Sequence, residues 1–415
     1  MTNYYRGLVG HLPGRVNVLT VQTPGGPEYD GASLVPTLRL RPSTCWLDRL
    51  GGHRRWYHAA RRLVERRGVE LVHCGNASPY RWVVQRLWRK TATPFVIYFH
   101  GNDVARAGRR LAGSPFHSRS WRRIADACSA FVVNSAYTAR LARKLLPISA
   151  DDVVVCHPGV DDAFLGLQYT AVLDHAGPPR LLGLGRLLPR KGFDTVIRAL
   201  ALLKRRGLEV HYRLAGGGDQ APYRRLAAQH GVAEQVEFLG FVDDDYIPDL
   251  LRWADAFSMV SRLEDHGTDV EGFGIVYLEA GALGRPVIAG RSGGVEDAVL
   301  DGRTGLLVDD PGSPAAVAAA RKAGSSFCVR KNSDFTLRSM TLSQPFSGNS
   351  SIGAPQLAPA LLNRICSAGS RSRSASAKAC TPSTLPRLEG MAMHSPNAPS
   401  SSAVAASSSS RRAVM

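Results

Sequence analysis

The feature that most constrains the fold is a regular alternation of short, β-branched apolar runs with longer helical stretches. This alternation is typical of βαβ units and therefore of parallel sheets. The apolar runs are nearly continuous, as expected for strands that helices cover on both faces. The first series predicts strands at 16–21, 70–73, 95–99, 130–134 and 153–157, and helices at 54–67, 80–89 and 136–145.

A second series of the same kind follows a segment at 162–179 that loses the rhythm and is predicted to be a linker. It predicts strands at 180–184, 210–215, 236–238, 256–260, 286–289 and 305–308, and helices at 194–205, 221–230 and 274–283. Both series fit an α/β fold with two Rossmann-like domains whose parallel sheets face each other across a cleft. We expect an N-terminal domain at 1–165 and a C-terminal domain at 178–320. Such sheets bind ligands at the carboxyl ends of their strands.

The pattern stops after residue 320, and residues 323–415 form a low-complexity tail. Of these 93 residues, 22 are serine, and no period of two or 3.6 is sustained. Such a composition cannot bury enough apolar surface to fold alone, so we expect a disordered tail. A basic tether and a non-native extension, for example from a reading-frame shift, both explain it, and the composition favours the second.

The chain is strongly basic, with a formal net charge of +18. The tail carries ten Lys or Arg and two acidic residues, so its share is +8 and the rest of the chain holds +10. Positive charge on the folded part favours phosphate-bearing substrates or an anionic membrane surface. Nucleic-acid binding is not expected, because no recognised module or aromatic-interleaved basic motif is present.

Zinc, redox and secretory roles find no support in the sequence. None of the seven cysteines forms a C-x-x-C pair. The N-terminus lacks the basic start and apolar stretch of a signal peptide, and no apolar window approaches the length of a membrane span. We therefore expect a cytoplasmic protein that associates peripherally with the inner membrane face.

A glycine-rich and basic loop follows the first strand of the second series, with the sequence LGLGRLLPRK at 182–191. Gly183 and Gly185 allow close backbone approach, while Arg186 and Lys191 place two cations on one loop at the end of a strand. This combination suits a diphosphate, whose negative charge grows as it departs. A solvated loop at a helix start explains the pattern equally well.

The segment DVEGFGIVYLE at 269–279 places Glu271 before a Gly-Phe-Gly turn and Glu279 on the helix that follows it. The helix that follows the turn exposes its first amides, which can hold phosphate or sugar oxygens. Glu279 lies on an apolar stretch, where a carboxylate is costly unless it binds something, such as two ribose hydroxyls. The alternative is a helix-start Glu271 and a core-edge ion pair at Glu279.

Two further positions follow predicted strands. Ser292, Gly293 and Gly294 could form a phosphate-facing backbone nest or a simple tight turn. His100 directly follows the strand at 95–99, where it could bind substrate or donate to a sugar hydroxyl, although a lone histidine is more often structural.

Taken in order, these motifs resemble glycosyltransferase family 4, which has the two-domain GT-B fold. The resemblance runs from about residue 6 to residue 314 and is strongest over 183–309. The motifs that carry it are GRLLPRKGFD, RLAGGGD, VEFLGFV, EGFGIVYLEA, GRPVIAG, SGGVEDAV and DGRTGLLV. The stretch at 269–290 is similar to the phosphatidylinositol mannoside mannosyltransferase branch, whose donor is GDP-mannose.

The resemblance implies a role for each matching position and a reaction without a metal or another cofactor. The transferred sugar would come from a nucleotide diphosphate sugar and pass, with retained configuration, to a lipid or glycan hydroxyl. The implied roles are diphosphate binding for Arg186 and Lys191, catalysis for Glu271 and His100, backbone contacts to sugar and phosphate for Gly272, Phe273 and Gly274, and ribose binding for Glu279.

Both ends of the sequence depart from the family pattern. The resemblance implies a first strand and a glycine-rich loop at the start of family members, and we expect this chain to start inside the helix that would follow that loop. Relatives also continue beyond Pro314 with helices, where this chain has its serine-rich tail. These departures support an alternative, a catalytically silent remnant that binds a nucleotide sugar without turnover.

Overall fold

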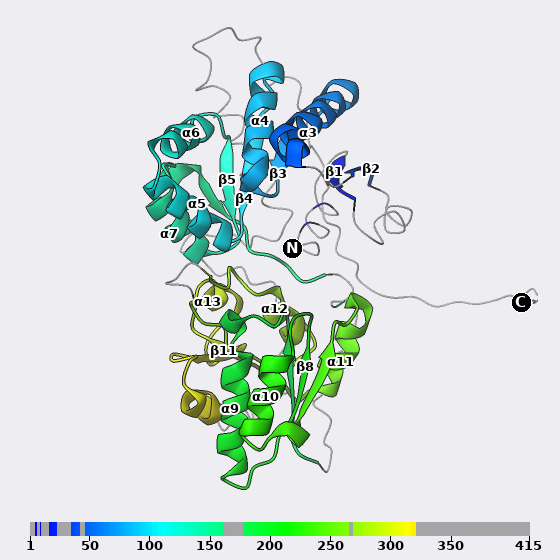
Figure 1. Cartoon of the computed structure of the whole chain (residues 1–415), viewed down its shortest axis with the longest axis vertical. Coiled ribbons are helices and arrows are strands. Elements are labelled where there is room, and N and C mark those ends of the chain that lie inside the picture. Colours follow the sequence, from blue (N-terminus) through cyan, green and yellow to red (C-terminus); the bar gives the residue numbers. More distant parts are fainter. Residues whose placement is uncertain are drawn as a thin grey trace, which may run out of the picture. The chain divides into compact units, whose positions relative to one another are not determined.

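The computed structural model describes Tyr5, Val9, residues 16–22, 35–41 and 46–161, Phe164, and residues 177–264 and 269–320, with the backbone alone over 46–53. The predicted tail at 323–415 and most of the predicted linker at 162–179 lie outside the described residues. Figure 1 shows the described elements in sequence colours.

The first large sheet has four parallel strands in the order β3-β4-β5-β6. Its central strands β4 and β5 are completely buried. Phe99 stacks on Phe131 with ring centroids 5.7 Å apart, and Trp121 packs beside Phe99. The strands are β3 (Val72–Cys74), β4 (Phe95–Phe99), β5 (Ala130–Val133) and β6 (Val153–Val155).

Helices cover this sheet, and several of them begin directly after a strand. Ser135 caps α7 by accepting a hydrogen bond from the Thr138 amide, as expected for a serine at this position. Helices α3 and α4 lie side by side (Figure 1). The helices are α3 (Trp46–Arg67), α4 (Ala77–Thr91), α5 (Asn102–Ala112), α6 (Pro115–Ala125) and α7 (Ala136–Leu145), and a 3₁₀ turn, η1 (Ala150–Asp152), precedes β6.

The second sheet has six parallel strands in the order β12-β11-β10-β7-β8-β9. From β7 the chain builds outward to β8 and β9, then returns to place β10 on the other side of β7. The strand order therefore reverses between β7 and β10, and a doubly wound sheet binds ligands at the carboxyl ends of such a pair. The strands are β7 (Arg180–Leu184), β8 (His211–Ala215), β9 (Val236–Gly240), β10 (Ala256–Met259), β11 (Val287–Gly290) and β12 (Gly305–Val308).

The helices of this part pack on the sheet through apolar faces. Phe193 and Ile197 of α9 are fully buried against it, and α9 and α10 lie side by side (Figure 1). The helices are α9 (Phe193–Lys204), α10 (Ala221–Gln229), α11 (Ile247–Trp253), α12 (Ile275–Ala282) and α13 (Val295–Ala298). Short 3₁₀ turns η2 (Pro189–Lys191), η3 (Ala233–Gln235) and η4 (Asp244–Tyr246) precede α9, β9 and α11.

The structure confirms the α/β class and two Rossmann-like arrangements but differs from the sequence expectation in detail. The run predicted at 16–21 forms β1 (Val18–Val21), which pairs with β2 (Thr37–Leu40) in a separate two-stranded parallel sheet. The β-branched pattern indicates a strand but says nothing about its partner. Helices α5, α6, α11 and α13 were not predicted: the first two are rich in arginine and the last two are very short.

In the part of the chain that the structure describes, no helix combines the length and apolar character needed to cross a bilayer.

Candidate active site

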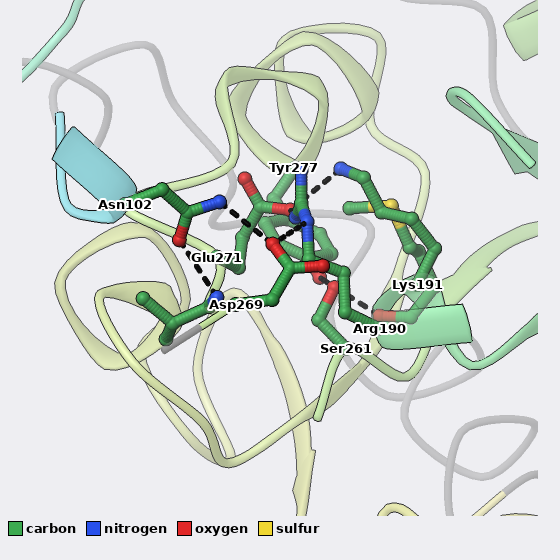
Figure 2. Close-up of polar contacts among 9 residues, drawn as sticks. Asn102, Arg190, Lys191, Ser261, Asp269, Glu271 and Tyr277 are labelled. Atoms are coloured by element: carbon green, nitrogen blue, oxygen red, sulfur yellow. Dashed lines mark hydrogen bonds and ion pairs between the residues drawn. The ribbon is translucent and has the colours of Figure 1, made fainter. Parts of the chain in front are cut away.

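The loops that follow β7 and β10 meet at the point where the strand order reverses, and an ion-pair cluster lies there. Arg190 and Lys191 stand on η2, and Glu271 comes from the segment before α12. Arg190 Nη1 donates to Glu271 Oε2 at 2.7 Å, and Lys191 Nζ donates to the same oxygen at 2.5 Å. Figure 2 shows both basic side chains directed at this carboxylate.

All three charged side chains of this cluster are largely buried, with exposed fractions of 8% for Arg190, 11% for Lys191 and 12% for Glu271. Burial alone would raise the pKa of Glu271, but Lys191 and Arg190 outweigh it and the pKa is lowered. The carboxylate is therefore ionised at neutral pH. No described residue donates a hydrogen bond to its other oxygen, Oε1, so this oxygen can accept one from a ligand hydroxyl.

A second carboxylate, Asp269, extends the cluster. Its Oδ1 lies 3.1 Å from Arg190 Nε, an ion pair without good hydrogen-bond alignment. The same oxygen accepts a hydrogen bond of 2.7 Å from Asn102 Nδ2. Asn102 Oδ1 in turn accepts from the Val270 amide at 2.8 Å. Asn102 is the first residue of α5, so the cluster reaches a residue that follows β4 of the first sheet (Figure 2).

Glycines hold the backbone around Glu271 in a shape that no other residue fits. A Cβ atom on Gly272 would lie 2.0 Å from the carbonyl oxygen of His100. Gly274 has a φ of 94°, and a Cβ there would meet the Tyr277 ring at 2.4 Å. The Gly294 amide donates to the Glu271 carbonyl at 2.9 Å. The predicted nest at 292–294 therefore supports the turn that carries Glu271.

Helix α12 is fixed to the second sheet by a buried tyrosine. Tyr277 Oη donates to the Met259 carbonyl at 2.8 Å and lies 3.3 Å from Ser261 Oγ. Glu279 is 7% exposed on the same helix. Phe273 is buried and stacks on His157, with ring centroids 5.6 Å apart. Gly274 at the N-cap of α12 has no side chain to cap the helix, so among the described residues the amides of Ile275 and Val276 are left for a ligand.

His100 lies at the carboxyl end of β4 and is held by a residue far away in sequence. Its Nε2 lies 2.6 Å from Tyr5 Oη and 3.3 Å from the Gly75 carbonyl oxygen, to which Tyr5 Oη also donates. Its amide donates to Asp103 Oδ1 at 2.9 Å. Burial lowers the pKa of His100, although Asp103 opposes this effect. A neutral imidazole at this place can exchange a hydrogen bond with a sugar hydroxyl.

Arg186 and Lys191 have different surroundings. Lys191 is buried beside Gly185, where a Cβ would stand 3.7 Å from Nζ, and it is engaged by Glu271. Arg186 is exposed, and its side chain makes no hydrogen bond or ion pair with the residues that the structure describes. Its guanidinium is therefore available to an anion from solvent.

The sequence singled out Lys191 and Glu271 of this cluster but missed its other members. The structure brings Lys191 and Glu271 into contact and sets the backbone of His100 against that of Gly272. Arg190, Asp269, Asn102 and Tyr5 were not recognised. A signal existed for Arg190 and Asp269, which lie within the quoted segments at 182–191 and 269–279. Asn102 and Tyr5 instead depend on contacts between distant segments.

A metal centre was not expected from the sequence. Among the residues with described positions, no group of three or more His, Cys, Asp or Glu side chains is placed to hold a metal ion.

Comparisons with known proteins identify relatives of this chain. A family model described as glycosyl transferases group 1 matches residues 171–323, and one described as glycosyltransferase family 4 matches residues 1–164. The chain is 35% identical over 331 residues to the GDP-mannose-dependent alpha-(1-6)-phosphatidylinositol monomannoside mannosyltransferase of Mycolicibacterium smegmatis, covering 74% of this chain and 81% of that one. The protein of the same description from Mycobacterium tuberculosis H37Rv is 34% identical over 324 residues, covering 74% and 80%.

Solved structures share the fold at lower sequence identity. The sucrose-phosphate synthase from Thermosynechococcus elongatus has a TM-score of 0.63 and 19% identity, covering 88% of this chain and 93% of that one. Anabaena HepE in complex with UDP and glucose has a TM-score of 0.58 and 18% identity, covering 87% and 100%. With the GT-B fold and the family matches together, the chain belongs to the family 4 glycosyltransferases.

Proposed function

We propose that this chain transfers mannose from GDP-mannose to a hydroxyl of a lipid or glycan acceptor, with retained anomeric configuration and without a metal. The observation that carries the proposal is the Glu271 carboxylate at the strand-order reversal of the second sheet. It is ionised between Arg190 and Lys191, and its Oε1 accepts no hydrogen bond from the described residues. The mannosyltransferase relatives support the donor, since both are GDP-mannose-dependent enzymes.

The arrangement supports a division of labour around the donor. Arg186 and Lys191 would bind the diphosphate, aided by the uncapped amides at the start of α12. The Oε1 atom of Glu271 would accept a hydrogen bond from a sugar hydroxyl, and Glu279 would hold the ribose. His100 would contact the sugar, as would the backbone of Gly272, Phe273 and Gly274. The backbone of Gly272 lies directly against that of His100.

The reaction follows from these roles. The bond between the anomeric carbon and the diphosphate oxygen breaks, and the acceptor oxygen bonds to that carbon from the same face. The departing phosphate takes the acceptor proton, so no protein base is needed. Arg186 and Lys191 stabilise the charge that develops on the diphosphate, which is the main stabilisation of a transition state of this kind.

The acceptor side of the proposal rests on charge. The chain outside residues 323–415 carries a net +10, which would favour an acceptor with a phosphate-bearing headgroup and peripheral contact with an anionic leaflet at the cytoplasmic face. The domain bounds of 1–165 and 178–320 remain part of the proposal, with acceptor binding assigned to the first and donor binding to the second.

The test is transfer from radiolabelled GDP-mannose to a mixed phosphoinositide and mannoside acceptor set in EDTA, with the product configuration read by NMR. Glu271→Gln should abolish transfer, while Glu237→Gln, which breaks a 2.6 Å ion pair with Arg213 far along the same sheet, should not. Transfer by Glu271→Gln at the parent rate would refute the role of Glu271. Tight nucleotide binding without any turnover would favour the silent remnant.

A further inference from the structure

Lys191 faces two demands that conflict. In the structure its ammonium is bound to Glu271 at 2.5 Å, yet the proposed function needs the same ammonium on the donor diphosphate. Its flexible four-carbon stem can turn from one anion to the other. If Lys191 were the only cation beside Glu271, its departure would leave a buried carboxylate without a partner, which is strongly unfavourable.

Arg190 has the surroundings that resolve this conflict. Its guanidinium is fixed by two carboxylates, Glu271 at 2.7 Å and Asp269 at 3.1 Å, and only 8% of the side chain is exposed. Its carbonyl accepts from the Arg262 amide at 2.8 Å, which holds the backbone of η2 as well. A planar guanidinium that donates to Glu271 and forms an ion pair with Asp269 is less free to turn than a lysine ammonium.

We propose that Arg190 is a positioning residue that keeps Glu271 in place when Lys191 turns to the donor diphosphate, and that Asp269 and Asn102 hold Arg190 in that orientation. This inference rests on the proposed function, because it deepens the roles of Lys191 and Glu271 within the same site. Arg190 touches neither donor nor acceptor in this scheme and acts through the Glu271 carboxylate.

The link to Asn102 gives the arrangement a further consequence. Asn102 bonds both to Asp269 and to the Val270 amide, and it lies two residues after His100. The contacts that hold Arg190 in place therefore include the segment that carries His100. Loss of Asn102 should loosen Glu271 and His100 together without removing a group that binds phosphate.

The first test compares the dissociation constants of GDP and GDP-mannose by calorimetry. Lys191→Gln should weaken both ligands, by about tenfold or more for a lost charge-assisted contact. Arg190→Gln should change the dissociation constant of GDP by no more than about threefold. The ratio of the GDP-mannose constant to the GDP constant should rise about tenfold, as for one lost charge-assisted contact. Arg190→Lys should recover part of this ratio, and Arg213→Gln, which loses a 2.6 Å ion pair outside the site, should change neither constant.

A second test uses double-mutant cycles with Glu271→Gln, measured by denaturant unfolding with and without GDP. The coupling energy between Arg190 and Glu271 should be the same with and without GDP. The coupling energy between Lys191 and Glu271 should be smaller when GDP is bound. Arg190→Gln weakening GDP as strongly as Lys191→Gln would overturn the inference alone, because Arg190 would then bind the diphosphate itself. A parent chain that binds no nucleotide would refute the proposed function and this exchange with it.

Discussion

Gly272 approaches His100 so closely that a Cβ atom on Gly272 would lie 2.0 Å from the His100 carbonyl oxygen. The obstacle is backbone, which cannot swing aside as the end of a flexible side chain does. The same glycine separates Glu271 from the start of α12, so its backbone sets where the carboxylate and the helix amides point. A residue chosen from the sequence for its amide group is thus also required for its lack of a side chain.

We expect Gly272→Ala to lower transfer strongly and to reduce the free energy of unfolding by about 1–3 kcal/mol, the usual range for forced overpacking. The reason is that either the His100 loop or the turn after Glu271 must move. Steady-state kinetics and denaturant unfolding check this. Gly113→Ala is the matched control, since a Cβ there meets its nearest atom at 3.9 Å. Equal activity of both variants would show that the close approach does not matter for the site.

The sequence was informative wherever one segment carries its own signal. The strands at 95–99, 180–184 and 305–308 were predicted with the observed bounds, because each is a compact apolar run in a parallel sheet. The pairing of Lys191 with Glu271 was not predicted, although both were chosen, since the motifs were read as separate ligand contacts. Parallel sheets bring the ends of β7 and β10 together only in the folded chain.

Other residues left no local trace. Tyr5 reaches His100 across 95 positions, and Asn102 reaches Asp269 across 167. Neither segment has a periodicity that points to the other. Arg186 shows the opposite case: the sequence marked it, and the structure leaves it exposed. A surface cation of this kind acquires a partner only when a ligand binds. The role of Arg186 in holding the diphosphate is therefore tested by measuring GDP binding.

The ionisation of Glu271 makes a prediction about pH. Its pKa is lowered from 4.5 in the folded chain, so the folded state holds its proton less tightly than the unfolded state. The stabilisation from this group is therefore present above pH 4.5 and is lost as the pH falls through the folded pKa. We expect the stability advantage of the parent over Glu271→Gln to be constant from pH 7 to pH 5 and to shrink below 4.5.

Urea unfolding at a series of pH values measures this advantage. Glu237→Gln serves as the control, because Glu237 pairs with Arg213 at 2.6 Å but is 55% exposed. An advantage that grows on acidification would mean that burial, which opposes the two cations, dominates at Glu271.

His73 gives a prediction in the first sheet that is independent of the donor site. Burial lowers its pKa from 6.5 to about 4, and its Nδ1 lies 2.9 Å from Tyr98 Oη. Between these pH values the unfolded chain binds a proton that the folded chain does not, so stability falls as the pH drops from 6.5 to 4. Each unit of pKa difference corresponds to about 1.4 kcal/mol.

We therefore expect His73→Gln to flatten the pH dependence of unfolding between pH 6.5 and pH 4, and the exposed His58→Gln to leave it unchanged. Urea unfolding at matched ionic strength checks both. A parent chain whose stability is level across this range would contradict a neutral, buried His73.

Substitutions of Arg186 and Lys191 are expected to weaken GDP binding alike but to differ in their effect on the free energy of unfolding. Arg186→Gln should weaken GDP by about tenfold or more, through the loss of a charge-assisted contact, and leave the free energy of unfolding within about 0.5 kcal/mol. Lys191→Gln should weaken GDP by a similar factor and also destabilise the unliganded chain, because it removes a cation that lies 2.5 Å from the buried carboxylate of Glu271. Calorimetry with GDP and urea unfolding without it give the two quantities.

Added salt should weaken GDP binding of the parent more than that of Arg186→Gln, since an exposed cation is screened most. If Arg186→Gln binds GDP like the parent, the diphosphate does not reach this loop, and the proposed donor position at the end of β7 is wrong.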